Sequence, residues 1–250
     1  MIEGLKNRRT VRKYLDKGIS DDLLTELLEL ACRASNTGNM QLYSIVITRD
    51  NEQKKRLAPA HFNQSMVTTA PVVITFCADV NRFVKWCAQR NAEPGFDNFQ
   101  TFIAAVIDSM LVAQTFCNAA EDKGLGICYL GTTTYNADKI IEILNLPSLV
   151  VPITTITLGY PDGLPAQVER LPLEAIVHNE KYKDYTADDI NRHYEAKELL
   201  AENKKFITEN KKETLAQVFT DVRYTKKNNE YFSEVFLKVL KDQEIGRAHV

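Results

Sequence analysis

The amino-acid sequence predicts an α+β domain with a helical C-terminal extension. Three observations lead to this fold class. Short β-branched runs alternate with helical patterns as far as residue 159, residues 102–121 are apolar nearly all round, and the chain becomes strongly charged and helical in pattern after Gly163. No Pro- or Gly-rich linker and no internal repeat divides the 250 residues, so we expect a single domain over residues 1–243.

The first predicted elements are a helix, a strand, a charged helix and a second strand. The helix covers residues 20–31, where Ser20 can cap the first turn and leucines recur at helical spacing. The strands cover residues 43–48 and 72–77, which are short β-branched runs bounded by polar or turn residues. Residues 51–57 lie between the strands and have the charge of an exposed helix.

A long apolar segment at residues 102–121 comes next, and its scattered alanines would allow close contacts between helices. We therefore expect a buried central helix that is also a candidate dimer surface. Gly124 and Gly126 end this helix. The following patterns predict a strand at 127–130, a helix at 138–144 and a buried strand at 150–159 that Pro152 interrupts.

The last third of the chain is predicted to be mainly helical. Residues 170–177 look extended, and a helical extension begins at about residue 186. It contains a charged helix at 188–208 and one or two amphipathic helices at 214–240. Residues 244–250 continue no apolar period, so we interpret them as a suspected non-native tail; a natural disordered tail is the alternative.

Composition excludes several classes of protein. The 31 Lys and Arg residues are balanced by 33 Asp and Glu without a long single-sign block, which argues against nucleic-acid binding. Five cysteines without a C-x-x-C pair predict free thiols in a reducing compartment and no metal site. The N-terminus is too charged for a signal peptide, and the purely apolar stretches are shorter than the roughly 18 residues of a membrane span. We therefore expect a soluble, cytoplasmic protein with no membrane partner.

Two polar clusters are candidates for ligand binding. Residues 7–14 place Arg8, Thr10 and Arg12 on one side of an extended segment, where two guanidinium groups and a hydroxyl suit a phosphate monoester. Residues 34–43 form a loop rich in amide and hydroxyl side chains that could bind the edge of a planar heterocycle. Each cluster has a plainer alternative, a solvated basic strand for the first and a helix C-cap with a turn for the second.

Taken in order, these clusters and four later segments resemble the FMN-dependent nitroreductase family. The segments that carry the resemblance are RRTVRKY at Arg8–Tyr14, ASNTGNMQ at Ala34–Gln41, FNQ at Phe62–Gln64 with APVVI from Ala70, GLGICYLG at Gly124–Gly131, LGYP at Leu158–Pro161 and VHNEKY at Val177–Tyr182. The resemblance covers roughly residues 4–240 and is closest to the oxygen-insensitive, NADPH-preferring subgroup. It implies a nitroreductase-like fold with a central, mostly antiparallel sheet flanked by helices.

The resemblance also implies which residues bind FMN. The phosphate and ribityl corner would consist of Arg8, Arg9, Thr10 and Arg12, and Arg170 would close it. The ring and ribityl chain would be lined by Asn36, Thr37, Asn39 and Gln41, with Asn63 and Gln64 at the pyrimidine end. The residues over the ring would be Tyr129, Leu130, Gly131 and Thr132. This chain departs from the subgroup at Val168, where a lysine is common, and at Ser35–Asn36, where relatives often have Pro-Ser.

The activity that the resemblance implies is that of an FMN-dependent NAD(P)H oxidoreductase, which reduces nitroaromatics, quinones or free flavin by ping-pong two-electron transfer. FMN would carry the chemistry, so no catalytic side chain and no metal is expected. NADPH or NADH would be the electron donor, and Arg223, Lys226 and Lys227 are candidates for binding the NADPH 2'-phosphate. Family members are homodimers with FMN at the interface. A non-enzymatic FMN-binding or storage module is the alternative, and the four histidines are expected to be structural.

Overall fold

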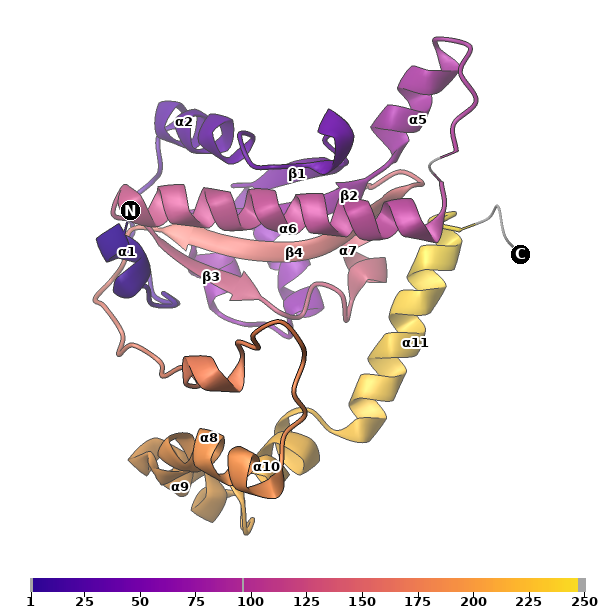
Figure 1. Ribbon diagram of the computed structural model, residues 1–250. Coiled ribbons are helices and arrows are strands. Elements are labelled where there is room, and N and C mark those ends of the chain that lie inside the picture. The colour runs from indigo at the N-terminus through magenta and orange to yellow at the C-terminus, as the bar shows by residue number, and fades with distance from the viewer. Residues whose placement is uncertain (1, 96, 247–250) are drawn as a thin grey trace. The chain divides into compact units, whose positions relative to one another are not determined.

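The computed structural model describes residues 2–95 and 97–246, and its contacts divide the chain into two units (Figure 1). The first unit is Met1–Ala166 with Phe232–Val250, and the second is Gln167–Tyr231. Of the suspected non-native tail at 244–250, residues 247–250 lie outside the described residues. Within the described part of the tail, Ile245 packs against a core cluster that contains Val239 and Leu240.

Within the described residues, four strands form one sheet at the centre of the first unit. Their order is β1 (Tyr43–Thr48), β2 (Val72–Asp79), β4 (Val150–Gly159) and β3 (Gly126–Leu130), and every neighbouring pair is antiparallel. The predicted α+β class and the antiparallel sheet are thus confirmed. All eight residues of β2 are buried, because β2 has strands on both sides and helices over both faces.

Pro152 lies within β4 without breaking it. It faces Cys77 across the β2–β4 ladder at the position where the register shifts by one residue. On its other side β4 pairs with β3 only from Thr155 to Gly159, so Pro152 lies beyond the end of β3. The missing N–H of proline is tolerated because it falls at a bulge and an unpaired edge.

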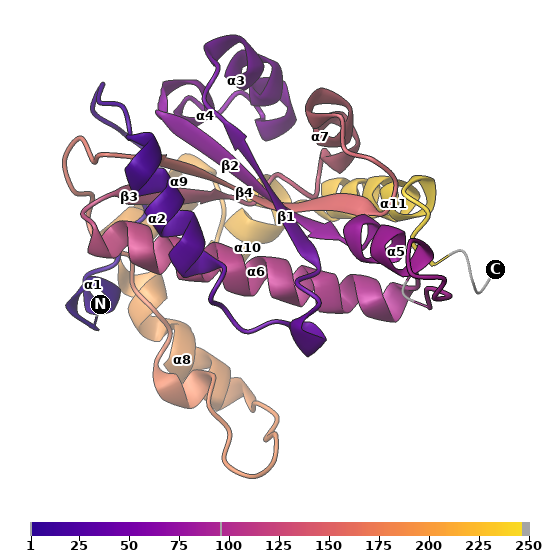
Figure 2. The same cartoon turned by 90° about the horizontal axis from the view of Figure 1, so that it is seen from above.

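One face of the sheet is covered by α2 (Asp21–Ala31) and α6 (Phe99–Asp122), as Figure 2 shows. Ser20 caps α2 by accepting a hydrogen bond from the main-chain N–H of Leu23, as its sequence pattern predicts. Leu27 of α2 and Phe116 of α6 are fully buried against β2 residues such as Ile74. The alternation along β2 sends every second side chain into this cluster.

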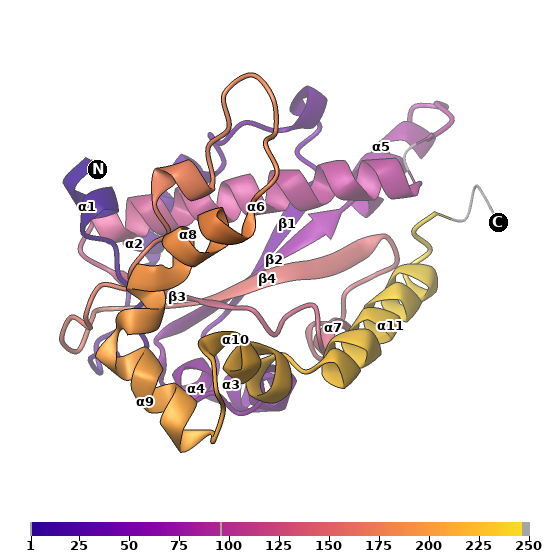
Figure 3. The same cartoon turned by 60° about the horizontal axis from the view of Figure 1, so that its bottom comes forward.

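The opposite face carries α3 (Asn51–Leu57), the short helices η2 (Ala58–His61) and α4 (Met66–Thr69), and α7 (Ala137–Leu144). The core cluster on this face contains Val73, Cys128 and Leu130. Their neighbours along the same strands point to the first face of the sheet, where the cluster with Leu27 and Phe116 lies. The part of α11 (Lys226–Asp242) that belongs to the first unit packs beside α7, where Figure 3 shows the two helices as neighbours.

The N-terminal segment lies beside β3, at the end of the β3–β4 pair where Gly126 faces Gly159. It begins with the short helix α1 (Ile2–Lys6), which the sequence pattern did not predict, and the main-chain N–H of Val11 donates to the carbonyl of Ile127 at 2.9 Å. Gly126 and Gly159 face each other in the ladder, and a Cβ on Gly126 would lie 2.6 Å from the Cβ of Val11. This paired lack of side chains lets the segment lie directly on the sheet.

The length and composition of α6 are those of a helix that could cross a membrane. Ten of its side chains are nevertheless buried within the first unit, including the carboxylate of Asp108. These contacts are those of a core helix in a globular unit. Polar residues such as Asp108 and Ser109 interrupt its apolar runs, in agreement with the expectation that purely apolar stretches are shorter than a membrane span.

The second unit is mainly helical. It contains η3 (Leu173–Ala175), α8 (Ala187–Leu199), α9 (Ala201–Glu209), α10 (Leu215–Val218), a π-turn at Phe219–Arg223 and the start of α11. The predicted helix at 188–208 is two helices, because Leu200 has extended backbone angles. The predicted extended stretch at 170–177 contains the turn η3. In the first unit, α5 (Asn81–Ala88) and η1 (Thr37–Asn39) complete the described elements.

Candidate active site

The residues Arg8, Arg9, Thr10 and Arg12, here called the arginine corner, follow α1 at the C-terminal end of α6. The Nε atom of Arg8 lies 3.4 Å from Oε1 of Glu121, the last acidic residue but one of α6. Both side chains are largely buried, with relative exposures of 22% and 13%. This contact uses the inner nitrogen of the guanidinium and leaves the terminal pair for bidentate binding of a phosphate.

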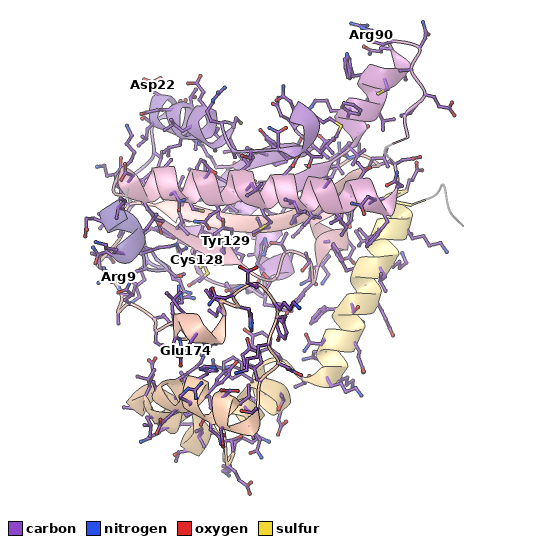
Figure 4. The ribbon with its side chains drawn as sticks, viewed as in Figure 1. Arg9, Asp22, Arg90, Cys128, Tyr129 and Glu174 are labelled. Atoms are coloured by element: carbon purple, nitrogen blue, oxygen red, sulfur yellow. The ribbon has the colours of Figure 1, made fainter. Side chains whose placement is uncertain are left out.

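The charges of Arg12 and Arg8 are felt at the middle of β3. Burial raises the pKa of the Cys128 thiol, and the positive charges of Arg12 and Arg8 partly oppose that rise. Arg9 instead donates from Nη1 to the carbonyl of Asn7 at 3.2 Å. Figure 4 labels Arg9 beside α1 and Cys128 and Tyr129 on β3.

Two cavities open at the arginine corner. One has a volume of about 210 Å³ and is lined by Asn7, Arg8, Arg9, Glu121 and the glycines at 124 and 126, among others. The other has a volume of about 350 Å³ and is lined by Thr10, Arg12, Lys13 and Asp162, among others. Val11 and Leu164 line both cavities. The cationic side chains of the corner therefore border open space on both sides of Val11.

At the end of β3, the groups accessible to a ligand are main-chain atoms and the hydroxyl of Thr132. Tyr129 is directed toward α6, where its Oη donates to Oε1 of Gln114 at 3.3 Å, and Leu130 is buried in the core cluster on the opposite face. Leu130 therefore offers only its main chain to a ligand. Gly131 is exposed and Thr132 is half-buried, so these two residues form the accessible part of the predicted ring contact.

A turn at residues 58–64, here called the histidine turn, lies against the loop that follows β3. His61 is fully buried, and its Nδ1 lies 2.9 Å from Oγ1 of Thr132. Asn136 donates from Nδ2 to the carbonyl of Ala60 at 2.9 Å. Burial lowers the pKa of His61 to about 4, so the imidazole is neutral at neutral pH.

The histidine turn carries Asn63 and Gln64, the two amide residues of the predicted site, and its backbone is strained at Phe62 and Asn63. Phe62 and Asn63 are both in the left-handed region, with φ of 54° and 53°, which is unusual for a bulky residue. Gln64 donates from Nε2 to the carbonyl of His61 at 3.1 Å. The structure thus brings Asn63, Gln64 and Thr132 to one place, joined through His61.

The loop at residues 36–41, here called the amide loop, is anchored by Asp108 of α6. Oδ1 of Asp108 accepts hydrogen bonds from the main-chain N–H of Thr37 at 2.8 Å and from its hydroxyl at 3.0 Å, and Oδ2 accepts from the N–H of Leu42 at 3.2 Å. Asn36 caps the loop by accepting from the N–H of Gln41. The loop contains three left-handed residues, Gly38, Asn39 and Gln41.

Within one chain the amide loop and the arginine corner do not meet. The amide loop is attached to α6 at Asp108, and the arginine corner is attached at Glu121. At a rise of 1.5 Å per residue, these two attachment points lie about 20 Å apart along the helix axis. In Figures 1 and 2, α1 lies beside one end of α6, whereas η1 lies along its length. A single protomer therefore holds the amide loop apart from the arginine corner.

The remaining predicted residues lie in the second unit. Arg170 is exposed and donates from Nη1 to the carbonyls of Val168 and Glu169. Arg223 stacks over the ring of Phe206, with 4.5 Å from its Cζ to the ring centroid, and Lys226 lies 3.6 Å from Glu230. His178 accepts at Nδ1 from the N–H of Lys183 and contacts the hydroxyl of Tyr185, which is the structural role expected for it.

Sequence reasoning did not identify Asp108, Glu121 or His61 as site residues. Asp108 and Glu121 carry the acidic charges of an otherwise apolar helical segment, and that contrast is a signal that could have found them. His61 directly precedes the matched Phe62–Gln64 segment, but nothing in sequence indicates its contact with Thr132, which is 71 residues away. Buried charged or polar groups of this kind need partners, and their partners are set by the fold.

The described residues hold no group of three or more side chains that could bind a metal ion. All five cysteines are free thiols, as the sequence predicts. Burial raises the pKa of Cys77 and of Cys117 to about 12, so neither is a thiolate at neutral pH. The chemistry that this arrangement can provide on its own is binding: cations for a phosphate, and amides, a hydroxyl and main chain for a planar polar ring.

Comparison with known proteins gives consistent matches. Residues 5–160 match the model of the Nitroreductase family. The FMN reductase (NADPH) of Bacillus subtilis strain 168 is 32% identical over 189 residues, covering 75% of this chain and 76% of the relative. The oxygen-insensitive NADPH nitroreductase of Salmonella typhimurium is 31% identical over 182 residues, covering 73% and 74%. A crystal structure of a candidate oxidoreductase from Bacteroides fragilis NCTC 9343 has a TM-score of 0.96 and 63% identity, covering 97% and 99%.

Proposed function

This chain belongs to the nitroreductase family, and we propose that it is an FMN-dependent NAD(P)H oxidoreductase that reduces nitroaromatics, quinones or free flavin. The relatives described above are named for the reduction of FMN by NADPH and for NADPH-dependent nitroreduction. The observation that carries the proposal is the arginine corner, whose cationic side chains line two open cavities that share Val11.

The residues present fit FMN. The terminal nitrogens of Arg8 suit a phosphate, because its Nε is already held by Glu121. Asn63, Gln64 and Thr132 offer neutral donors and acceptors to a heterocycle, and Gly131 leaves room for its face. Arg170 is proposed as the further phosphate ligand, supported by its place in the segment that resembles the family.

When bound, FMN would supply the hydride chemistry between the nicotinamide and the acceptor. The side chains of this protein would bind and orient the cofactor and adjust its electrostatics. The arginine corner would hold the phosphate, and the histidine turn with Gly131 and Thr132 would hold the ring edge. Donors at that edge would stabilise the negative charge that develops on reduction. No side-chain nucleophile takes part in this scheme.

We infer that the working unit is a homodimer. The face of α6 away from the core exposes Phe99, Ile103, Ile107, Met110 and Leu111, an apolar stripe that a soluble monomer would leave in water. The amide loop and the arginine corner lie at different levels of the same helix. Antiparallel packing of two α6 helices about a twofold axis would bring the loop of one copy toward the corner of the other. The site would then be completed by both subunits.

NADPH is proposed as the preferred donor, with Lys226 and Lys227 as the cations for its 2'-phosphate. Arg223 is a weaker candidate than its charge suggests, because it is stacked on Phe206. A cytoplasmic location is supported by the five free thiols and by the requirement for a nicotinamide cofactor.

An anaerobic titration with NADPH tests the proposal. The protein reconstituted with FMN should show a flavin absorbance band that bleaches on addition of NADPH and returns on addition of menadione or a nitrofuran. Bound flavin that NADPH fails to bleach would instead indicate an FMN-binding or storage module. Protein that binds no FMN would contradict both functions. Comparing the turnover of free FMN, menadione and a nitrofuran would identify the class of acceptor.

A further inference from the structure

His61 is a buried imidazole with one polar partner among the described residues. Its relative exposure is 0%, and its Nδ1 lies 2.9 Å from Oγ1 of Thr132. Its Nε2 is also buried and has no hydrogen-bond partner within the described parts of the chain. Its neighbours in the chain, Leu57, Ala58 and Ala60, belong to a buried cluster of apolar side chains.

This environment selects one tautomer. If Nε2 carried the proton, a buried N–H would be left without an acceptor, an arrangement that is rare in folded proteins because the group loses its hydrogen bond to water. If Nδ1 carries the proton, it donates to Oγ1 of Thr132, and the unpaired atom is a neutral nitrogen lone pair. Burial also lowers the pKa of His61 to about 4, which keeps the ring neutral at physiological pH. The arrangement therefore favours His61 as a donor to Thr132.

A donor at His61 determines what Thr132 can do. A hydroxyl has one hydrogen and can accept through its lone pairs. With one lone pair of Oγ1 occupied by Nδ1–H, the hydrogen of the Thr132 hydroxyl must point away from His61. Thr132 is half-buried and follows the exposed Gly131, so that hydrogen is available to a ligand at the end of β3.

The contact is held on both sides. Asn136 binds the carbonyl of Ala60 at 2.9 Å, next to His61 in the chain. Tyr135 stacks on Phe232 with ring centroids 4.5 Å apart, and Phe232 meets the ring of Phe62 edge-on at 5.9 Å. These contacts join the histidine turn to the loop after β3, so the geometry between His61 and Thr132 is fixed by packing from both segments.

We propose that His61 is a positioning residue that donates from Nδ1 to Thr132 and thereby directs the Thr132 hydroxyl to donate to an acceptor atom at the edge of the bound flavin. The inference rests on the proposed function, because it needs the flavin ring at the end of β3. A donor at this edge favours the reduced, more negative flavin over the oxidised one. His61 itself has no route for proton transfer, since Nε2 is sealed from solvent.

The test measures the two-electron midpoint potential of bound FMN, the affinity for oxidised FMN and the melting temperature in four variants. Thr132→Val removes the hydroxyl at nearly constant shape, and His61→Leu removes the imidazole donor. His61→Asn keeps an amide donor near the position of Nδ1. The fourth variant combines His61→Leu with Thr132→Val. We expect Thr132→Val to weaken binding of reduced relative to oxidised flavin by about tenfold, the size of one hydrogen bond to a charged acceptor. For a two-electron couple this shift is about 30 mV toward lower potential.

His61→Leu should lower the potential in the same direction, His61→Asn should restore most of it, and the double variant should match Thr132→Val because the two residues act through one hydrogen bond. The inference would be overturned if His61→Leu and Thr132→Val lowered the melting temperature but left the midpoint potential unchanged. The hydrogen bond between His61 and Thr132 would then serve only to stabilise the fold. If His61→Leu fails to fold, the comparison of His61→Asn with Thr132→Val decides. Wild-type protein that retains no FMN would overturn the proposed function and this inference together, whereas flavin that bleaches normally with unshifted potentials overturns the inference alone.

Discussion

Arg8 and Glu121 form a largely buried ion pair in which Nε of the guanidinium lies 3.4 Å from one carboxylate oxygen. The other oxygen of Glu121 is buried and has no hydrogen-bond partner among the described residues. Burial raises the pKa of Glu121, and the neighbouring Arg8 partly opposes that rise. The pair joins the arginine corner to the end of α6 and holds one edge of a guanidinium that is proposed to bind phosphate.

Replacing Arg8 by Ala should give a protein that retains FMN poorly and is also less stable, because the largely buried Glu121 loses its partner. The variant loses charge-assisted hydrogen bonds to the phosphate, and we expect a loss of about 2 kcal/mol in binding free energy. Combining it with Arg12→Ala should weaken binding further, and Arg8→Lys should be intermediate because lysine lacks the planar fork. Fluorescence titration with FMN gives the dissociation constants. Arg33→Ala, at an exposed arginine outside the corner, is the matched control, and equal retention in Arg8→Ala and in this control would contradict the assignment.

Gly126→Ala should displace the N-terminal segment from the sheet. The added Cβ would lie 2.6 Å from Cβ of Val11, which cannot move aside because it is attached directly to the main chain. We expect a loss of about 1–3 kcal/mol in the free energy of unfolding, as for overpacking in a core, together with weaker FMN binding. Urea unfolding measures the first effect. Gly18→Ala is the control, since a Cβ at this exposed position meets nothing within 4 Å; its stability and FMN binding should be close to wild type.

Asp108→Asn should loosen the amide loop. The carboxylate accepts three hydrogen bonds from Thr37 and Leu42, and an amide nitrogen in place of one oxygen would face an N–H donor instead. A buried conflict of this kind costs about 1–3 kcal/mol. Hydrogen exchange at the N–H groups of Thr37 and Leu42 should speed up, while Asp16→Asn at an exposed position should change neither exchange nor stability. Unaltered exchange in Asp108→Asn would show that the loop does not depend on this anchor.

Ile107→Asp should break the proposed dimer. Ile107 is 52% exposed in one chain and lies in the apolar stripe of α6, so a charge there would be buried without a partner at a subunit interface. Sedimentation velocity should show monomers that retain little FMN. Ile107→Leu keeps an apolar side chain and should remain dimeric. A wild-type protein that sediments as a monomer in the presence of FMN would refute the shared site.

His61 should make the stability of the protein depend on pH below neutrality. Its pKa is lowered from 6.5 to about 4 by burial, so the unfolded chain binds a proton in this interval while the folded chain does not. The contribution of His61 to stability is therefore fully present above pH 6.5 and is lost as the pH falls toward 4, by about 3 kcal/mol over the interval. Urea unfolding at several pH values should show a smaller decline in His61→Asn than in wild type. Identical declines in the two proteins would contradict a buried neutral imidazole.

Local patterns predicted the elements that packing later used. The apolar period of residues 20–31 and the β-branched runs at 43–48 and 72–77 give the observed α2, β1 and β2, because side-chain periodicity determines which face can be buried. The helix α1 was missed because five residues carry too little pattern, and the break at Leu200 was missed because both flanking segments are equally charged. At the site, the alternation along β3 turns the side chain of Leu130 into the core, so its predicted ring contact can come only from its main chain.

The sequence by itself determined the family, the α+β class and the residue types of the candidate site, since these depend on composition and on the order of short motifs. The tertiary structure decided which of those residues share a place. It paired Arg8 with Glu121, anchored the amide loop on Asp108 and joined His61 to Thr132 across 71 residues. Buried charges and polar groups must find partners in three dimensions, and the long-range contacts that supply them leave no periodic trace in the sequence.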